Sequence, residues 1–190
     1  LYYRVLVNAA HTGCDQAVSQ VATVVVSPDI SVISQPANIT ECIGGNNQIS
    51  VTITGGAGSI SYQWQQSVDQ VSENFVNIPG ALGANYIPPS ATSGTMYYRV
   101  LINAANSGCD QAVSQISTVV ITPDVSILSQ PSDIIECIGG TDPLSVTMEG
   151  GAGAITYQWQ FSPANDPNQF DNIPEATSSA FIPPSTTSGT

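Results

Sequence analysis

The chain has 190 residues, of which 42% are apolar and only 8% are charged. Its formal net charge is -12, and it contains only two Lys or Arg residues. Nucleic acids and anionic membrane surfaces are therefore poor partners, because both are bound through clusters of Lys and Arg. The apolar share is high enough to build a folded core. No apolar run approaches the roughly 20 residues that cross a bilayer, so no membrane insertion is expected in this segment.

Apolar and polar residues alternate along the chain, without a helical period. The alternation predicts strands, in order, at residues 29–42, 48–54, 59–66, 75–79, 85–88, 96–104 and 111–121. Asn106-Ser107-Gly108 has the composition of a hairpin turn between the last two. Short strands separated by glycine-rich turns predict an all-β fold, an antiparallel sandwich of two sheets.

This pattern occurs twice, because residue n reappears at n+95 without a gap. Leu1-Tyr2-Tyr3-Arg4-Val5 returns as Met96-Tyr97-Tyr98-Arg99-Val100, and about 60% of all positions are identical between the copies. A period of this length suits one compact domain. Tandem units of domain size supply reach or valency rather than new chemistry.

The order of the strands sets the expected domains. Residues 1–27 are the last two strands of a preceding unit, residues 28–123 are a complete domain, and residues 124–190 are the next domain without its last two strands. We therefore expect a segment of a longer repetitive protein with abutting units. Donation of the missing strands by another molecule is the alternative.

Several motifs carry a family resemblance. Gly44-Gly45, Val51-Thr52-Ile53, Tyr62-Gln63-Trp64-Gln65 and the run from Thr92 to Val100 resemble an immunoglobulin-like domain. The tandem form, with Gly-Cys-Asp in the last hairpin, resembles the Ig-like repeats of giant surface adhesins of the Bacteroidetes, including those of gliding motility. One departure is that Ile53 and Val100 stand where antibody domains place their core cysteines, so packing is expected to replace a central disulfide.

The aromatic residues divide between two faces. Tyr62, Trp64 and Tyr98 share the inward face by alternation, which favours core packing over a sugar-binding platform. The expected core residues are Trp64, Trp159, Tyr62, Tyr98, Ile53 and Val100. The outward residues Tyr97, Arg99, Gln63 and Gln65 form a candidate contact strip, which we name the outer strip. Its alternative is a cross-strand surface cluster that contributes little.

The cysteines Cys14, Cys42, Cys109 and Cys137 occupy two equivalent sites per unit, and their even number favours disulfides over free thiols. The sequence has no CxxC or Cys-plus-His spacing, which argues against metal binding. Pairing of Cys42 with Cys109 in one domain, and pairing of Cys42 with the hairpin cysteine of the following unit, both stay open. The sequence-local pairs Cys14–Cys42 and Cys109–Cys137 join distant strand ends and are rejected.

No catalytic or nucleotide-binding motif is present. His11 is the only histidine and becomes Asn106 in the second copy, which predicts a solvated hairpin tip. Acidic residues near the junctions are candidate ligands for Ca²⁺ between domains, with solvated charge as the simpler interpretation: Asp15, Asp29, Glu41, Asp110, Asp124, Asp133 and Glu136.

We therefore predict a non-enzymatic, extracellular structural and adhesive array that forms a rod or filament at the cell surface. Its partners are neighbouring repeats, with a surface polysaccharide or another cell-surface protein as further candidates. The alternative is a carbohydrate-binding or spacer module of a secreted multidomain hydrolase.

Overall fold

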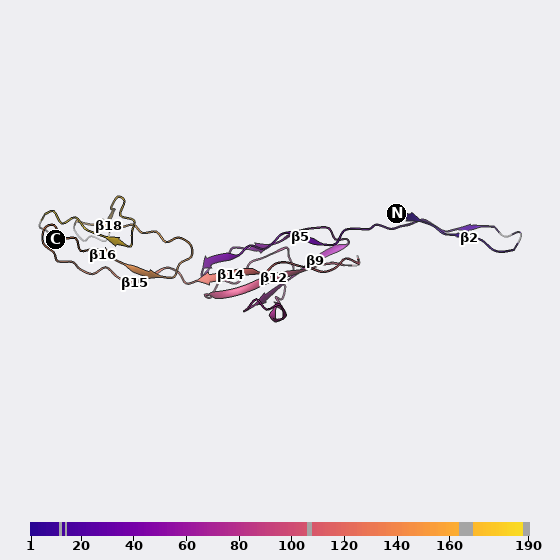
Figure 1. The fold of residues 1–190 in the computed structure, drawn as a ribbon, viewed down its shortest axis with the longest axis horizontal. Coiled ribbons are helices and arrows are strands. Elements are labelled where there is room, and N and C mark those ends of the chain that lie inside the picture. The colour runs from indigo at the N-terminus through magenta and orange to yellow at the C-terminus, as the bar shows by residue number, and fades with distance from the viewer. Residues whose placement is uncertain (12, 14, 106–107, 164–168, 188–190) are drawn as a thin grey trace.

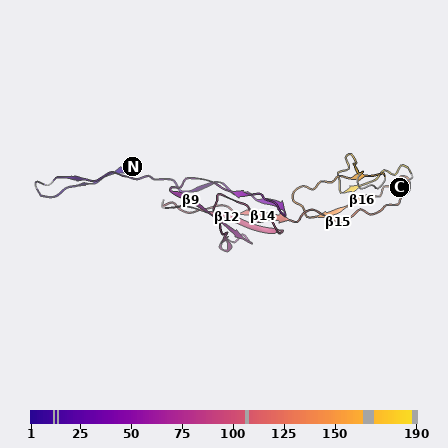
Figure 2. The same cartoon turned by 180° about the vertical axis from the view of Figure 1, so that it is seen from behind.

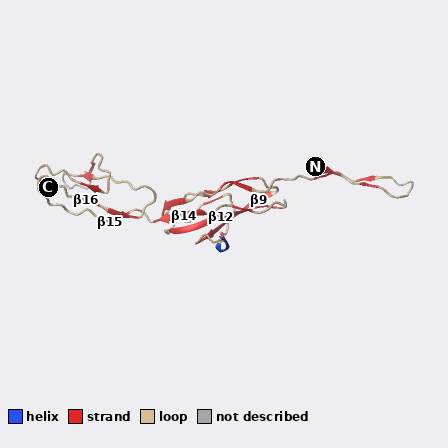
Figure 3. Ribbon diagram, in the orientation of Figure 1, coloured by secondary structure: helices blue, strands red, loops and turns tan. Residues whose placement is uncertain are grey.

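The computed structural model describes all residues except 12, 14, 106–107, 164–168 and 188–190. Its regular structure in the described ranges consists of strands and one 3₁₀ turn, η1 (Ser72–Asn74) (Figure 3). Two opposite views show an elongated arrangement, with an N-terminal hairpin at one end, a central sandwich and a C-terminal unit at the other end (Figures 1 and 2). The predicted all-β class is confirmed.

The central sandwich is formed by the strands β5 to β14. Its larger sheet has the order β10-β9-β12-β14-β6, and β13 also pairs with β12. The facing layer contains the pairs β5–β8 and β11–β7. The strands are β5 (Ser31–Ser34), β6 (Ile39–Cys42), β7 (Ile49–Ser50), β8 (Thr52–Thr54), β9 (Ser59–Ser67), β10 (Val76–Asn77), β11 (Asn85–Tyr86), β12 (Gly94–Ala105), β13 (Ala112–Val113) and β14 (Ser117–Thr122).

The first predicted strand, residues 29–42, is in fact two strands in different layers. Its first half, β5, pairs antiparallel with β8, and its second half, β6, pairs parallel with β14. Gln35 and Pro36 lie between them, and Pro36 lacks the N–H that a continuing antiparallel ladder needs. The predicted single strand is therefore corrected to two strands, and the pairing of β6 with β14 is parallel within the sandwich.

The core lies between the two layers and is centred on Trp64. Val100 lies opposite Trp64 across β12 and β9, and both side chains are fully buried. The indole Nε1 of Trp64 donates a hydrogen bond to the Gly83 carbonyl at 2.9 Å, and its ring stacks on Tyr86 at a centroid distance of 6.1 Å. Tyr98 is also buried, whereas Ile53 and Tyr62 are partly buried against this cluster. Packing fills the centre of the unit, as the apolar residues at positions 53 and 100 imply.

The two flanking parts reproduce portions of this sandwich. The N-terminal hairpin contains β1 (Tyr2–Tyr3), β2 (Leu6–Val7), β3 (Ala17–Val18) and β4 (Ala22–Thr23). The C-terminal unit contains β15 (Ser126–Ser129), β16 (Leu144–Ser145), β17 (Thr147–Glu149), β18 (Gln160–Phe161), β19 (Asp171–Asn172) and β20 (Ala180–Phe181). Trp159 repeats the role of Trp64, with Nε1 donating to the Ser178 carbonyl at 2.8 Å, although it is only partly buried.

Candidate functional site

Arg99, on the outer face of β12, is held by β9 and by the segment that follows it. Its Nε donates to Gln65 Oε1 at 2.7 Å, while Nη1 and Nη2 donate to the hydroxyl and the carbonyl of Ser72, each at 3.0 Å. The guanidinium carbon lies 4.4 Å from the centre of the Phe75 ring, in cation–π geometry. Neutral groups and an aromatic ring therefore hold Arg99.

The two glutamines of the outer strip are also engaged inside the unit. Gln65 is buried and its Nε2 donates to Asn77 Oδ1 at 2.8 Å. Gln63 Nε2 donates to the Ile78 carbonyl at 2.9 Å. Both bonds tie β9 to the short strand β10 and the residues after it. The structure thus brings Gln63, Gln65 and Arg99 together as a cross-strand cluster, with Tyr97 half-buried beside Arg99 in β12.

Sequence reasoning did not find the partners Ser72, Phe75 and Asn77. The segment 66–76 differs strongly from its copy 161–171, and no strand pattern points at Arg99. One signal was present, because Phe75 and Asn77 return as Phe170 and Asn172 among changed neighbours. The bond from Gln65 to Asn77 is reproduced from Gln160 to Asn172 at 2.8 Å. This repetition marks the contact as part of the unit's framework.

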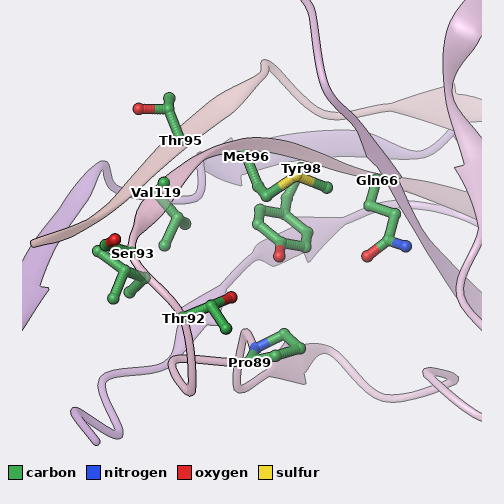
Figure 4. Close-up of a pocket in the computed structure, with 10 residues that line it drawn as sticks. Gln66, Pro89, Thr92, Ser93, Thr95, Met96, Tyr98 and Val119 are labelled. Atoms are coloured by element: carbon green, nitrogen blue, oxygen red, sulfur yellow. The ribbon is translucent and has the colours of Figure 1, made fainter. Parts of the chain in front are cut away.

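A small hollow lies where the loop before β12 meets the ends of β12 and β14, with Pro89, Thr92, Met96 and Tyr98 among its lining residues (Figure 4). Its volume of about 270 Å³ is below the range of most small-molecule sites. Burial raises the pKa of Tyr98 to about 12, and the charge of Tyr86 adds to the shift. The phenol is therefore neutral at physiological pH, and the hollow offers no poised acid or base.

The strand register places the cysteines at opposite ends of the central sandwich. Cys42 pairs with Thr122, and its Sγ lies 3.7 Å from Thr122 Oγ1. Cys109 follows the far end of β12, a strand of 12 residues that spans about 40 Å. A disulfide needs Cα atoms within about 7 Å, so pairing of Cys42 with Cys109 in one domain is incompatible with this register. Cys42 and Cys137 are free thiols, and Cys14 lies outside the described residues.

The acidic residues near the junctions do not converge. Across the described ranges, no group of three or more His, Cys, Asp or Glu side chains gathers in a way that suits a metal ion. Asp29 Oδ1 accepts a hydrogen bond from the Asp110 amide at 3.4 Å, which ties the turn side of the last hairpin to the start of the unit. Glu41 is buried, and its Oε2 accepts from the Asn47 amide at 3.1 Å. These carboxylates brace turns within the unit.

The remaining residues that the sequence suggested stay apart from these contacts: His11 is exposed on the N-terminal hairpin, and Asp15, Asp124 and Asp133 are exposed as well. Glu136 Oε2 accepts from the Asp142 amide at 3.2 Å, which repeats the Glu41 contact in the C-terminal unit. No helix in the described part of the chain is long and apolar enough to cross a membrane.

Two facing layers of strands enclose a tryptophan, and β14, the last strand of the long hairpin, lies beside β6. The consecutive strands β5 and β6 belong to different layers. These features define an immunoglobulin-like β-sandwich. Residues 32–123 match the family described as Domain of unknown function (DUF8696). None of the curated proteins matches the sequence.

Solved structures similar to this chain contain immunoglobulin or fibronectin domains. Sidekick-1 immunoglobulin domains 1-5 match at 13% identity and a TM-score of 0.49, over 98% of this chain and 40% of that one. DIP-gamma IG1+IG2 matches at 12% identity and a TM-score of 0.40, over 84% of both chains. Chicken CNTN1 FN1-FN3 domains match at 12% identity and a TM-score of 0.34, over 94% of this chain and 61% of that one. This chain thus spans less than half the length of the Sidekick-1 structure.

Proposed function

We propose that this chain belongs to a non-catalytic, extracellular repeat array that forms a rod or filament at the cell surface and supports adhesion. In this proposal residues 28–123 are one complete unit, residues 1–27 end the preceding unit and residues 124–190 begin the next. The resemblance to tandem Ig-like repeats of Bacteroidetes surface adhesins supports the adhesive role. Neighbouring repeats, surface polysaccharides and other surface proteins are the proposed partners.

The observation that carries the proposal is the construction of the junctions. Only residues 123–125 separate β14 from β15, so no flexible linker intervenes. The Pro123 carbonyl accepts a hydrogen bond from the Gly151 amide at 2.8 Å, and the Pro28 carbonyl accepts the same bond from the Gly56 amide at 2.8 Å. The chain therefore enters both units in the same way. A constant entry geometry, repeated, produces a regular rod.

Gly150 makes the second junction tight. Its φ is +73°, a conformation that favours glycine, and an added Cβ would overlap the Asp124 carbonyl. Gly55 has a φ of +76° and meets the Asp29 carbonyl in the same way at the first junction. The turn after the second strand is thus seated on the first residues of its own unit, which stiffens the entry point.

A carbohydrate-binding module is the weaker candidate. A sugar platform would need free polar groups beside exposed aromatic faces. Gln63, Gln65 and Arg99 of the outer strip instead bond within the unit, and Phe75, which Arg99 covers, is buried. The outer strip therefore supports a framework role.

Small-angle X-ray scattering tests the rod. We use the chain extended after Thr190 by a copy of residues 96–122, so that both sandwiches are complete. The expected result is an elongated particle whose maximum dimension matches two units end to end. A control variant with Gly-Ser-Gly-Ser-Gly-Ser inserted between Pro123 and Asp124 is expected to sample bent shapes. Equal flexibility of the two proteins would refute a stiff junction.

A further inference from the structure

Both units contain a groove at the same place in the fold, where the chain crosses from β10 to β11 or from β19 to β20. In the central sandwich it has a volume of about 620 Å³ and is lined by Gln48 and by residues within 78–87. In the C-terminal unit it has a volume of about 340 Å³ and is lined by residues within 174–182. Both volumes fall in the range of ligand sites. Because residues 174–182 are the copy of residues 79–87, we name this feature the crossover groove.

The backbone that shapes the crossover groove is the same in both units. The Trp64 amide donates to the Ala81 carbonyl at 3.0 Å, and their copies Trp159 and Ala176 repeat this bond at 2.9 Å. The indole of Trp64 also donates to the Gly83 carbonyl, and that bond is repeated in the C-terminal unit. The core tryptophan therefore fixes the position of the turn, whatever side chains the turn carries.

The side chains on this constant backbone differ between the copies. The lining positions that change, each written with its copy, are Gly80/Glu175, Leu82/Thr177, Gly83/Ser178, Asn85/Ala180 and Tyr86/Phe181. A turn that is bonded to the core, with side chains that change from copy to copy, allows units of one fold to have different binding preferences.

Glu175 is the change that strains the backbone. Its φ is +62°, in the left-handed region that residues other than glycine avoid, whereas Gly80 at the equivalent position has a φ of +76°. Among the described residues, Glu175 is the only non-glycine residue with a positive φ. Its side chain is exposed, so burial does not compensate for the strain. A carboxylate placed at a strained position on the rim of a groove points to binding of a cationic group.

The edge of the smaller sheet supplies backbone groups beside the groove. In the described part of the chain, β11 pairs with β7 alone and β20 pairs with β16 alone. The Val51 amide donates to the Ala84 carbonyl at 3.0 Å, so the N–H and C=O groups of Asn85, one residue further on, point away from β7. An extended peptide can bond to such groups by strand addition.

A peptide fits this site better than a sugar does. A sugar would stack on an exposed aromatic face. The ring of Tyr86 instead packs inside the unit, with its centroid 6.1 Å from that of Trp64 and 5.8 Å from that of Tyr98. The chain also carries a net charge of -12, which favours a basic partner over an acidic one.

We propose that the crossover groove binds an extended peptide of a partner surface protein, whose backbone pairs with the free edge of β11 or β20 and whose side chain enters the groove. The C-terminal unit selects a basic side chain through Glu175. The central sandwich selects an apolar side chain, because Leu82 is 60% exposed and Ile87 is 57% exposed there. This proposal rests on the adhesive role proposed above and names the chemistry of its partner.

The test uses the 190-residue chain and synthetic peptides of the sequence Thr-Val-X-Val-Thr, in which X is Arg, Leu or Glu. Backbone NMR spectra locate each peptide on the chain. We expect the Arg peptide to shift the amide signals of residues 175–182 and the Leu peptide to shift those of residues 80–87. The Glu peptide should bind the C-terminal unit at least threefold more weakly than the Arg peptide, because its charge is repelled by Glu175.

Two variants separate the charge of Glu175 from the strain. Glu175→Gln removes the charge and keeps a non-glycine residue at the position, so affinity for the Arg peptide should fall at least threefold while the unfolding temperature stays unchanged. Glu175→Gly should lose the same affinity and raise the unfolding temperature, because glycine adopts a positive φ without strain.

Gly80→Glu is the reciprocal change in the central sandwich. A Cβ atom at Gly80 meets no atom within 4 Å, so the side chain fits, and the φ of +76° predicts a lower unfolding temperature. The Arg peptide should then also shift the amide signals of residues 80–87.

Absence of amide shifts in both grooves at about 1 mM peptide, where even weak contacts are populated, overturns the proposal. Equal affinities for the Arg and Glu peptides overturn it as well, and so does an affinity for the Arg peptide that Glu175→Gln leaves unchanged. A chito-oligosaccharide, as a cationic sugar probe, that shifts residues 175–182 when no peptide does would assign the groove to a polysaccharide instead. A stiff, elongated particle in the scattering experiment without peptide binding would leave the rod intact and exclude this site, whereas peptide binding by a flexible chain would do the reverse.

Discussion

Val100 lies directly opposite Trp64 across β12 and β9, and neither side chain has any exposed surface. Ile53 and Val100 stand where antibody domains place their core cysteines, so packing of Val100 against Trp64 holds the centre of the unit in place of a disulfide. The free energy of unfolding of the sandwich therefore depends on close packing between these two side chains.

Val100→Ala should lower the free energy of unfolding of the central sandwich by about 2 kcal/mol, because it leaves a cavity beside the indole. The measurement is denaturant unfolding of the chain in a Trp159→Phe background, so that the fluorescence change reports Trp64. Val113→Ala, at a half-exposed position of the same hairpin, should cost less than about 0.5 kcal/mol. Equal losses in the two variants would contradict the central role of the Val100–Trp64 contact.

Arg99→Lys should destabilise the central sandwich by about 1 kcal/mol, because an ammonium group cannot bond Gln65 and Ser72 together while stacking on Phe75. Thermal unfolding gives the difference, and hydrogen exchange should speed up in residues 69–75. Since the partners are neutral, the difference should persist in 1 M NaCl, where the Debye length is about 3 Å. Arg4→Lys is the control, and a difference that disappears with salt would indicate an ion pair instead.

The raised pKa of Tyr98 predicts that the central sandwich loses stability at alkaline pH. Its pKa is raised to about 12 by burial, above the 10.0 of an unperturbed tyrosine. Between these values the unfolded chain releases the phenolic proton and the folded chain retains it. Stability is therefore full below pH 10 and falls as the pH rises toward 12. Denaturant midpoints across this window measure the effect, and Tyr98→Phe should reduce its slope while Tyr97→Phe should not. An unchanged slope in Tyr98→Phe would exclude this residue as the cause.

The faces of the long strands were predictable because the side-chain period of a strand is two. Alternation alone placed Trp64 and Tyr98 inward and Gln65 and Arg99 outward, and the register between β9 and β12 agrees. The prediction of one strand at 29–42 was wrong, because the chain changes sheets after Ser34. Alternation continues past Gln35 and carries no information on which sheet a strand joins. The partners of Arg99 come from an irregular turn, which has no period to detect.

The cysteine pairing could not be predicted from spacing, because spacing does not show at which end of the unit each cysteine lies. Spacing gave two equivalent sites per unit, and only the register of β6 beside β14 shows that Cys42 lies at the end of the unit that faces the next one. The Asp110 amide contacts Asp29, so the turn side of the hairpin lies at the opposite end, beside the junction with the preceding unit. A hairpin cysteine of one unit is thereby directed toward the Cys42 position of the unit before it.

We therefore predict disulfides between successive units. In the chain extended after Thr190 by a copy of residues 96–122, the cysteine of the added hairpin would face Cys42. Mild oxidation should form this bond within one chain, and alkylation followed by intact mass should detect the loss of two free thiols. Cys42→Ser should prevent the bond, whereas Cys137→Ser should not, because the unit that Cys137 would face is not part of this extended chain. A bond that survives Cys42→Ser would show that the cysteines pair in another way, and a bond mapped between Cys42 and Cys109 would exclude the inter-unit pairing.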